Sequence, residues 1–297
     1  MRLINILKAK LRRRFYIIGY GSTNDINFFV DSKPKNVRWI KFRDYKINWF
    51  ADPYILSETD SFIEFLVEEW IEDEQKGRLT KFSYEKRSGK IFNKKIILDL
   101  KTHLSFPSIV REGNIFYICP ENAASGKQKI YQYNLEKALL ENPITIINEA
   151  LLDVNIVKID NNYYAFGIKL LEDNKCDNYK LRIYRSDNLL GHYEFYQEID
   201  NNLAQERGAG SLFWYRNKLI RPVQNCEGDY GRNVIFKEVI LKDGVFRENV
   251  IGGIFPNCIY PEGLHTFNTF NSTYVIDSMA YDVGNWMTYI KRVLHRW

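Results

Sequence analysis

The chain repeats one short pattern five times, and this repetition limits its possible architecture more than any other feature of the sequence. Each copy has a strand-like run, a turn rich in Asp, Asn or Gly, and a second run with aromatic residues. Successive copies start about 45–57 residues apart, which is the period of a four-stranded propeller blade. The copies start at Asp52, Phe106, Asp153, Ala209 and Gly263. The pattern predicts an all-β, five-bladed β-propeller, with a β-sandwich as the structural alternative.

The last copy has too few strands before the chain ends to make a complete blade. We therefore expect the N-terminal runs Phe15–Tyr20 and Val37–Phe42 to supply the missing strands and close the ring. Aromatic residues make up 15% of the chain, led by 20 Tyr and 19 Phe, and such residues favour strands. No Gly/Ser linker or break in composition divides the sequence, so residues 15–285 are predicted to form one propeller domain.

The two ends of the chain carry its basic character. Residues 1–14 hold six basic side chains and residues 286–297 hold three, with no acid in either segment. The formal net charge is +5, so the rest of the chain is near −4, which argues against a nucleic-acid partner. Apolar residues recur at helical spacing in both segments, which predicts short basic amphipathic helices. These helices either bind an anionic membrane surface or pack on the propeller with their basic faces in solvent.

The sequence suggests a cytoplasmic protein that needs no metal or other cofactor. Its four cysteines are far apart and form no C-x-x-C pair, which argues against a zinc site or a disulfide framework. No apolar segment follows the basic N-terminus as in a signal peptide, and no uncharged run reaches the length of a membrane span. We expect a cytoplasmic location, with peripheral attachment to the inner membrane face if the terminal helices bind lipid.

Polar and ionisable residues occur near the starts of all five predicted inner strands. In a propeller these strands line the central channel, so their starts should meet at one mouth and form a pocket. Each residue also has a structural alternative, such as a turn-forming Asp, a buried His, or an Arg207 paired with Glu206 or Asp153. The residues at these starts are Asp52, His103, Asp153, Arg207, Glu262 and His265.

Several short motifs resemble the N-terminal domain of glucosamine inositolphosphorylceramide transferases. They are Trp49-Phe-Ala-Asp-Pro-Tyr-Ile, His103-Leu-Ser-Phe-Pro-Ser, Tyr117-Ile-Cys-Pro-Glu121, Arg207-Gly-Ala-Gly, Leu219-Ile-Arg-Pro-Val-Gln224, Asp229-Tyr-Gly231 and Gly263-Leu-His-Thr266. Together they span roughly residues 45–268. The resemblance implies a five-bladed propeller related to the family 43 glycoside hydrolases.

Those hydrolases use three acids, which this chain matches only in part. Asp52 in Ala-Asp-Pro matches their catalytic base, whereas Ser108 and Arg207 stand where the resemblance implies a pKa-tuning Asp and a general acid. An inverting hydrolase needs both an acid and a base, so hydrolysis would require a substitute acid. Glu121 is the best-placed substitute, with Glu68, Glu69 and Glu262 as the other candidates.

An arginine in place of an acid favours an anionic ligand, because a guanidinium binds phosphate or carboxylate through two N–H bonds. We therefore expect a sugar-transferring enzyme of surface-polysaccharide or glycolipid biosynthesis with a phosphate-activated donor. Asp52, Glu121, Arg207 and His265 are the candidate catalytic residues. The candidate substrate-binding residues are His103, Asp153, Arg221, Gln224, Tyr230 and Glu262. A glycoside hydrolase with a rearranged acid pair and a non-catalytic glycan-binding propeller are the alternatives.

Overall fold

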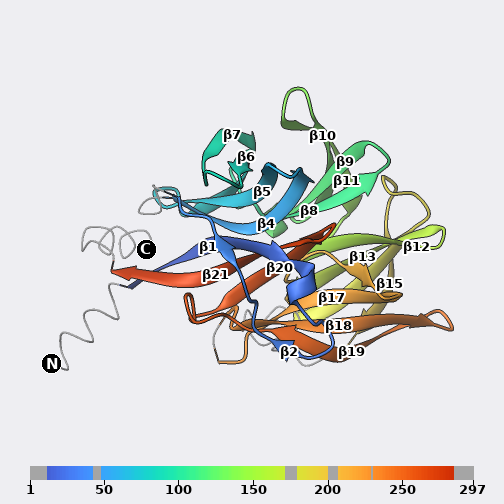
Figure 1. The fold of residues 1–297 in the computed structure, drawn as a ribbon. Helices are drawn as coiled ribbons and strands as arrows, with labels where there is room; N and C mark the ends of the chain where they lie inside the picture. Colours follow the sequence, from blue (N-terminus) through green and yellow to red (C-terminus); the bar gives the residue numbers. More distant parts are fainter. Residues whose placement is uncertain (1–11, 43–47, 171–178, 200–206, 229, 284–297) are drawn as a thin grey trace.

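The computed structural model describes residues 12–42, 48–170, 179–199, 207–228 and 230–283, and most of these lie in antiparallel strands. The strands form five sheets arranged as the blades of a propeller (Figure 1). Blade 1 contains β4 (Asn48–Glu58), β5 (Phe62–Ile71), β6 (Lys76–Glu85) and β7 (Ile91–Leu98). Blade 2 contains β8 (Ser105–Glu112), β9 (Ile115–Glu121), β10 (Gln128–Asn134) and β11 (Leu139–Ile147).

The third and fourth blades follow the same order along the chain. Blade 3 contains β12 (Leu152–Ile159), β13 (Asn162–Leu170), β14 (Tyr179–Ser186) and β15 (Glu194–Ile199). Blade 4 contains β16 (Phe213–Tyr215), β17 (Lys218–Asn225), β18 (Asn233–Lys242) and β19 (Val245–Ile254). The short strand β2 (Asp31–Ser32) adds to its outer edge, parallel to β19.

Blade 5 joins the two ends of the chain, as the sequence pattern predicts. It contains β20 (Leu264–Phe270), β21 (Thr273–Val283), β1 (Arg12–Ser22) and β3 (Arg38–Trp39). β1 pairs with β21 along its whole length, from Arg12 opposite Val283 to Ser22 opposite Thr273. The five-bladed propeller is therefore confirmed and the sandwich alternative is wrong.

The predicted terminal helices are not supported. Residues 12–14, the end of the first predicted helix, form the start of β1, because this segment pairs with β21 instead of coiling. The remainder of that helix and all of the helix predicted for 286–297 lie outside the described residues. Within the described part of the chain, helical structure is limited to two 3₁₀ turns, Thr23–Asp25 and Ala123–Ser125. No helix among these residues is long and apolar enough to span a membrane.

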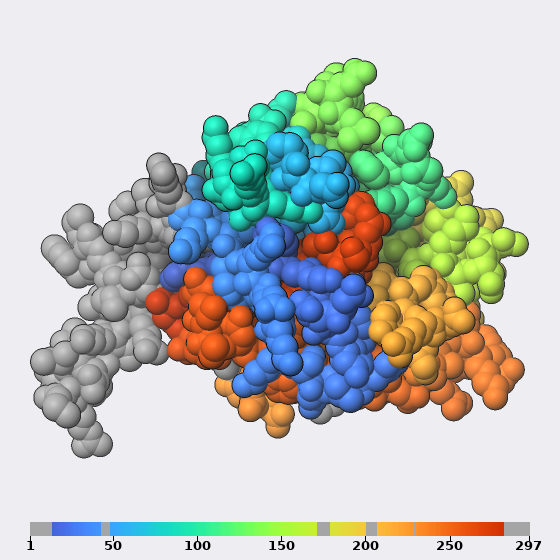
Figure 2. All heavy atoms as spheres, in the orientation of Figure 1, coloured from blue at the N-terminus to red at the C-terminus, as the bar shows by residue number. Residues whose placement is uncertain are grey.

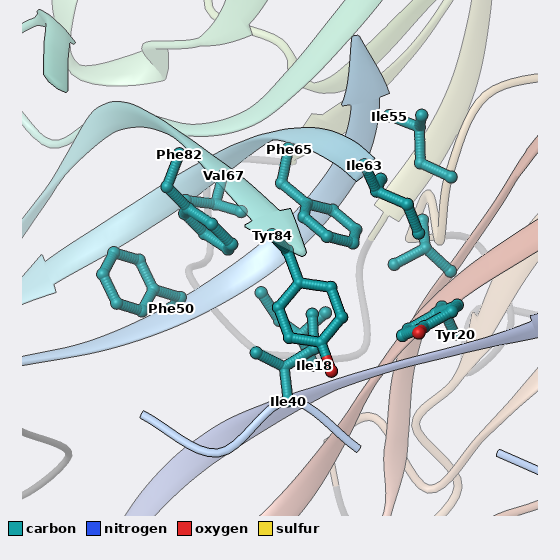
Figure 3. Packing of buried hydrophobic residues seen from close by; sticks show 11 residues of the cluster. Ile18, Tyr20, Ile40, Phe50, Ile55, Ile63, Phe65, Val67, Phe82 and Tyr84 are labelled. Atoms are coloured by element: carbon teal, nitrogen blue, oxygen red, sulfur yellow. The ribbon is translucent and has the colours of Figure 1, made fainter. Parts of the chain in front are cut away.

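Apolar side chains fill the spaces between neighbouring blades. Figure 3 shows the cluster between blades 5 and 1, where Ile18 of β1 meets Phe65, Phe82 and Tyr84. Ile18, Phe65 and Phe82 are fully buried, and burying each such side chain stabilises the fold by about 1.5–3 kcal/mol. This packing ties the first and last blades together, so it holds the pocket-forming inner strands in a fixed relation.

A β-bulge recurs near the start of several inner strands. The strand register shifts at Asp52, Phe106 and Asp153, and each of these residues has φ near +50°. A bulge places two residues opposite one and redirects the side chain of the extra residue. In blade 4 the equivalent segment contains Gly210 at φ 153°, where a Cβ would lie 1.9 Å from the Phe267 carbonyl oxygen. The repeated irregularity thus brings polar side chains to the same end of the channel.

Candidate functional site

A small polar pocket lies at this end of the channel and draws on all five blades. Its volume is about 240 Å³, below that of pockets for drug-sized ligands. Asp52 and Glu68 come from blade 1, Asp153 from blade 3 and His265 from blade 5. The described lining residues are Asp52, Glu68, His103, Ser105, Glu121, Asp153, Arg207, Gln224, Tyr230 and His265.

Asp52 is fixed by both of its neighbouring blades. Its backbone N–H donates to Asp277 Oδ2 at 2.9 Å, and its Oδ2 accepts the Phe106 N–H at 2.8 Å. Its Oδ1 lies 3.4 Å from His265 Nδ1 and has no hydrogen-bond partner among the described residues. Burial raises the pKa of Asp52 to about 6, although the nearby His265 charge opposes the shift. The side chain is therefore mostly ionised at pH 7, with one oxygen available to a ligand.

His265 carries the positive charge that Asp52 and Asp277 require. Burial alone would lower its pKa, but Tyr230 and Asp277 outweigh it and hold the pKa well above the usual value. The protonated ring donates from Nδ1 to Asp277 Oδ2 at 3.1 Å and from Nε2 to the Tyr230 hydroxyl at 2.9 Å. The Tyr16 ring packs against it at 4.7 Å between centroids. The Tyr230 hydroxyl oxygen accepts this bond.

Arg207 is paired with Asp153 rather than open to solvent. Its Nε lies 2.5 Å from Asp153 Oδ2 and its Nη2 lies 3.0 Å from Oδ1, which makes the pair bidentate. The Gly208 N–H also donates to Asp153 Oδ2 at 2.9 Å. Burial would raise the pKa of Asp153, but the Arg207 charge and these hydrogen bonds hold it below the usual value. Arg207 Nη1 has no hydrogen-bond partner among the described residues, so the guanidinium can still bind one more group.

Glu121 is a buried carboxyl group suited to hold a proton. Burial and the negative charge of Asp153 raise its pKa to about 8, against the opposing effect of Arg207. Its Oε2 lies 3.6 Å from Arg207 Nη2 and accepts the Asp153 N–H at 3.2 Å. Glu121 is therefore largely protonated at pH 7, whereas Asp52 is largely ionised. Pairs of carboxyl groups whose pKa values are pushed apart in this way supply acid and base roles.

Glu68 and His103 form the remaining side of the pocket. Burial and the Asp52 charge raise the pKa of Glu68 well above its usual value. Burial, with the Arg207 charge, lowers the pKa of His103 to about 4, so its ring is neutral. His103 Nδ1 accepts the Gly77 N–H at 2.8 Å, and its Nε2 lies 3.8 Å from Glu68 Oε1. Nε2 of the neutral ring therefore carries hydrogen and can donate it.

Eight of the ten predicted site residues line this pocket, and Arg221 and Glu262 do not. Arg221 was expected in an anion clamp, but its Nε lies 2.5 Å from Glu248 Oε1 in a buried ion pair. It points away from the channel because it is three residues from Gln224, and residues an odd number apart lie on opposite faces of a strand. Glu262 is exposed in the turn before β20. Neither residue belongs to the pocket.

Asp277 is the residue beside the pocket that sequence reasoning missed. It lies on the second strand of blade 5, whereas the prediction for that blade considered only Glu262 and His265, near the start of the first strand. It is fully buried, and its Oδ1 accepts the Thr266 N–H at 2.8 Å while Oδ2 contacts Asp52 and His265. The available signal was a single acid directly after the run Thr273-Tyr-Val-Ile, within the same predicted strand.

Asp52, His265 and Asp277 are also close enough to share a metal ion, with one ligand atom from each within 4.8 Å of the others. In the structure the protonated imidazole itself supplies the positive charge between the two carboxylates. The donor set therefore needs no further cation to balance Asp52 and Asp277.

Comparisons with known proteins place this chain in a family. A family model described as glucosamine inositolphosphorylceramide transferase 1, N-terminal, matches residues 39–289. The enzyme of that name from Oryza sativa subsp. japonica is 27% identical over 202 residues, covering 64% of this chain and 26% of the relative. The Arabidopsis thaliana enzyme is 28% identical over 165 residues, covering 52% of this chain and 21% of the relative. The chain thus spans about a quarter of the length of these curated relatives.

Solved structures share the fold at low sequence identity. The α-L-arabinanase of Cellvibrio cellulosa, in complex with arabinohexaose, superposes with a TM-score of 0.50 at 12% identity, covering 68% of this chain and 76% of that one. A family 43 β-xylosidase/α-arabinofuranosidase from a compost metagenome has a TM-score of 0.53 at 13% identity, covering 78% and 90%. At these identities the likeness concerns the propeller alone.

Proposed function

The chain belongs to the family of the N-terminal region of glucosamine inositolphosphorylceramide transferase 1, and from that premise we propose that its channel-mouth pocket binds a sugar and acts in sugar transfer. The observation that carries the proposal is the carboxyl pair Asp52 and Glu121. At pH 7 one is mostly ionised and the other mostly protonated, within the same small polar pocket. Sugar transfer needs a base for the acceptor hydroxyl and an acid for the leaving oxygen.

Each role follows from the contacts of the residue. Asp52 Oδ1, which lacks a hydrogen-bond partner among the described residues, accepts the proton of the attacking hydroxyl. Protonated Glu121 donates to the leaving oxygen. Asp153 orients Arg207 and keeps it charged. Asp277 and His265 are positioning residues, because they hold Asp52 through its backbone and its side chain.

The charges of the pocket favour a sugar with a protonated amine. Four carboxyl groups line it, against the charged groups Arg207 and His265, and His103 is neutral at pH 7. A ligand ammonium group beside Glu68 would stabilise the ionised form of that carboxyl, whose pKa is raised by burial and by the Asp52 charge, while Glu121 keeps its proton as the acid. Glucosamine, which the names of the relatives contain, has such an amine.

The proposal extends to a phosphate-activated donor through Arg207. The guanidinium uses Nε and Nη2 to hold Asp153, so Nη1 would contact the leaving phosphate. Charge-assisted hydrogen bonds of this kind stabilise the charge that develops on a leaving phosphate. The acceptor would lie on the Asp52 side of the pocket.

Two assays test this function. Saturation-transfer NMR with glucosamine and glucose should show binding of the amino sugar in preference to the neutral one. Release of UDP from UDP-glucosamine or UDP-N-acetylglucosamine should then fall about 10²–10⁴-fold in Asp52→Asn. Sugar binding without any donor turnover would restrict the pocket to glycan recognition, and absence of both would contradict the proposal.

Hydrolysis is the second candidate function, because the same acid and base would activate water. Addition of an acceptor alcohol to the donor assay separates the two. Transfer predicts a new glycoside at the expense of the free sugar, whereas hydrolysis predicts free sugar alone.

A further inference from the structure

We propose that the pocket-mouth face carries a docking surface for an anionic lipid membrane, built on the paired strands β1 and β21. Membrane attachment through this surface would be independent of the sugar chemistry of the pocket. In a blade the turn between the second and third strands lies at the end where the first strand starts, which here is the pocket end.

Blade 5 has no such turn, because its second and third strands are the two ends of the described chain. β21 ends at Val283 and β1 begins at Arg12, and these two residues are paired. Both chain ends therefore leave the propeller at one point, beside the pocket mouth. Figure 1 shows β21 in red and β1 in blue running together toward this point, and Figure 2 shows the body of the molecule on one side of it.

The paired strands also extend beyond the inner strand that they support. Ser278 pairs with Leu264, the first residue of β20, and the pairing of β21 with β1 continues from there to Val283. Five further residues span about 17 Å in a strand. We call the segment made of residues 12–16 and 279–283 the ribbon. Its base is buried, with Tyr16 packed on His265, and the ribbon continues from there past the mouth of the pocket.

The ribbon has the composition of a membrane-interface element. Arg14 lies against the Tyr281 ring at 6.0 Å, and Trp49, on the neighbouring strand β4, packs at 5.3 Å on Tyr16, which is buried at the base of the ribbon. Trp, Tyr and Arg together suit the headgroup level of a bilayer, where one end of each side chain is apolar and the other polar. Trp49 and Tyr281 are only half-buried, so part of each ring is accessible.

The positive charge of the ribbon and of the adjoining chain favours an anionic lipid as the binding partner. Arg12, Arg13 and Arg14 begin the ribbon, and the chain beyond it adds three basic residues in 1–11 and three in 284–297, without an acid. Asp282 is the acid within the ribbon. Each cation near an anionic surface strengthens attachment, roughly fivefold at low salt. The neighbouring turn of blade 1 carries Glu72, Asp73 and Glu74, so the ribbon rather than the whole rim would approach the lipid.

Hydrogen–deuterium exchange of the full chain, with and without vesicles, tests the docking surface. With phosphatidylglycerol/phosphatidylcholine vesicles at low salt, exchange should slow in residues 12–16 and 279–283. It should be unchanged at Trp214–Asn217, at the opposite end of the channel. Pure phosphatidylcholine, or salt well above 0.1 M, should remove the protection because screening shortens the range of the attraction.

A matched pair of charge reversals gives a second readout. Arg14→Glu should lower vesicle binding about tenfold or more in a sedimentation assay, whereas Arg216→Glu at the opposite end should leave it near wild type. Vesicle-independent protection that grows with protein concentration would indicate a second copy instead and overturn the proposal. Protection of Glu72–Glu74 in place of the ribbon, or no vesicle binding at low salt, would also overturn it.

Discussion

Arg207 and Asp153 form a bidentate ion pair between blades 4 and 3, with Nε 2.5 Å from Oδ2 and Nη2 3.0 Å from Oδ1. Both residues line the pocket, so the same arginine that joins two blades also forms part of the pocket wall. A planar guanidinium is needed for this geometry, because an ammonium group cannot present two parallel N–H bonds.

Arg207→Lys should therefore weaken both the fold and the site. We expect a loss of about 1–3 kcal/mol in the free energy of unfolding, since Asp153 keeps one charged partner but loses a hydrogen bond. Chemical denaturation measures this change. Arg182→Lys provides the control, because Arg182 pairs with Glu198 at a more exposed position and should cost less than about 1 kcal/mol. Equal losses at the two positions would contradict the special role of the bidentate pair.

The activity should have a bell-shaped pH dependence. Asp52 must be ionised and Glu121 protonated, so the rate should rise through an apparent pKa near 6 and fall through one near 8. Because these groups interact, the two apparent values belong to the cluster. Glu121→Gln should remove the alkaline limb along with most of the activity. A rate that stays flat from pH 5 to pH 9 would exclude this acid–base assignment.

The stability of the fold should also depend on Glu121. Its pKa is raised in the folded state, so its proton stabilises the fold at low pH, and this contribution is lost as pH rises from about 4.5 to about 8. Glu121→Gln replaces the carboxyl group by an amide, which is neutral at every pH. We predict that the variant melts higher than wild type at pH 9 and nearly equally at pH 4, as measured by differential scanning fluorimetry. A smaller difference at pH 9 than at pH 4 would contradict the raised pKa.

Arg221 should behave as a structural residue. It is buried with Glu248 and Lys237 and does not line the pocket. Arg221→Met removes one partner of a buried ion cluster and should cost about 3–5 kcal/mol in unfolding free energy. Glucosamine affinity, measured on the folded fraction, should stay near the wild-type value. A selective loss of sugar binding without a loss of stability would show that Arg221 is a sugar-binding residue after all.

Ring closure predicts a sharp difference between two N-terminal truncations. Deletion of residues 1–44 removes β1, β2 and β3, which leaves β21 with an unpaired edge and opens blade 5. Soluble expression and circular dichroism should show loss of the native fold. Deletion of residues 1–11 leaves β1 intact and should preserve the fold. A monomeric, cooperatively folded product of the longer deletion would show that closure by β1 is dispensable.

The fold could be predicted from the sequence because a blade is a local unit whose pattern recurs five times along the chain. The N-terminal closure also followed, since the last copy lacked strands that only the other end could supply. The terminal helices were predicted from periodicity alone, but Arg12–Arg14 form a strand because β21 offers them a backbone partner. The local spacing of apolar residues carries no information about a pairing strand as distant in sequence as β21.

The site was predictable where it depends on the starts of inner strands, as at Asp52, Asp153 and His265. Asp277 was missed because its role depends on a bulge in the neighbouring strand that lets a second-strand carboxylate reach Asp52 and His265. Arg221 was assigned to the pocket as a member of an anion clamp with Arg207. The alternation of a strand sends the side chains of Arg221 and Gln224 to opposite faces, and attention to that period would have separated them.

Binding of glucosamine to the folded protein, followed by saturation-transfer NMR, tests whether this pocket is a sugar site built on its carboxyl groups. Asp52→Leu and Glu121→Leu remove carboxyl groups from the pocket, and Glu262→Leu makes the same change in an exposed turn outside it. The account predicts saturable binding by the wild type and by Glu262→Leu, and a loss of about tenfold or more in affinity for each pocket variant. Equal binding by all four proteins, or no binding by the wild type, would contradict it.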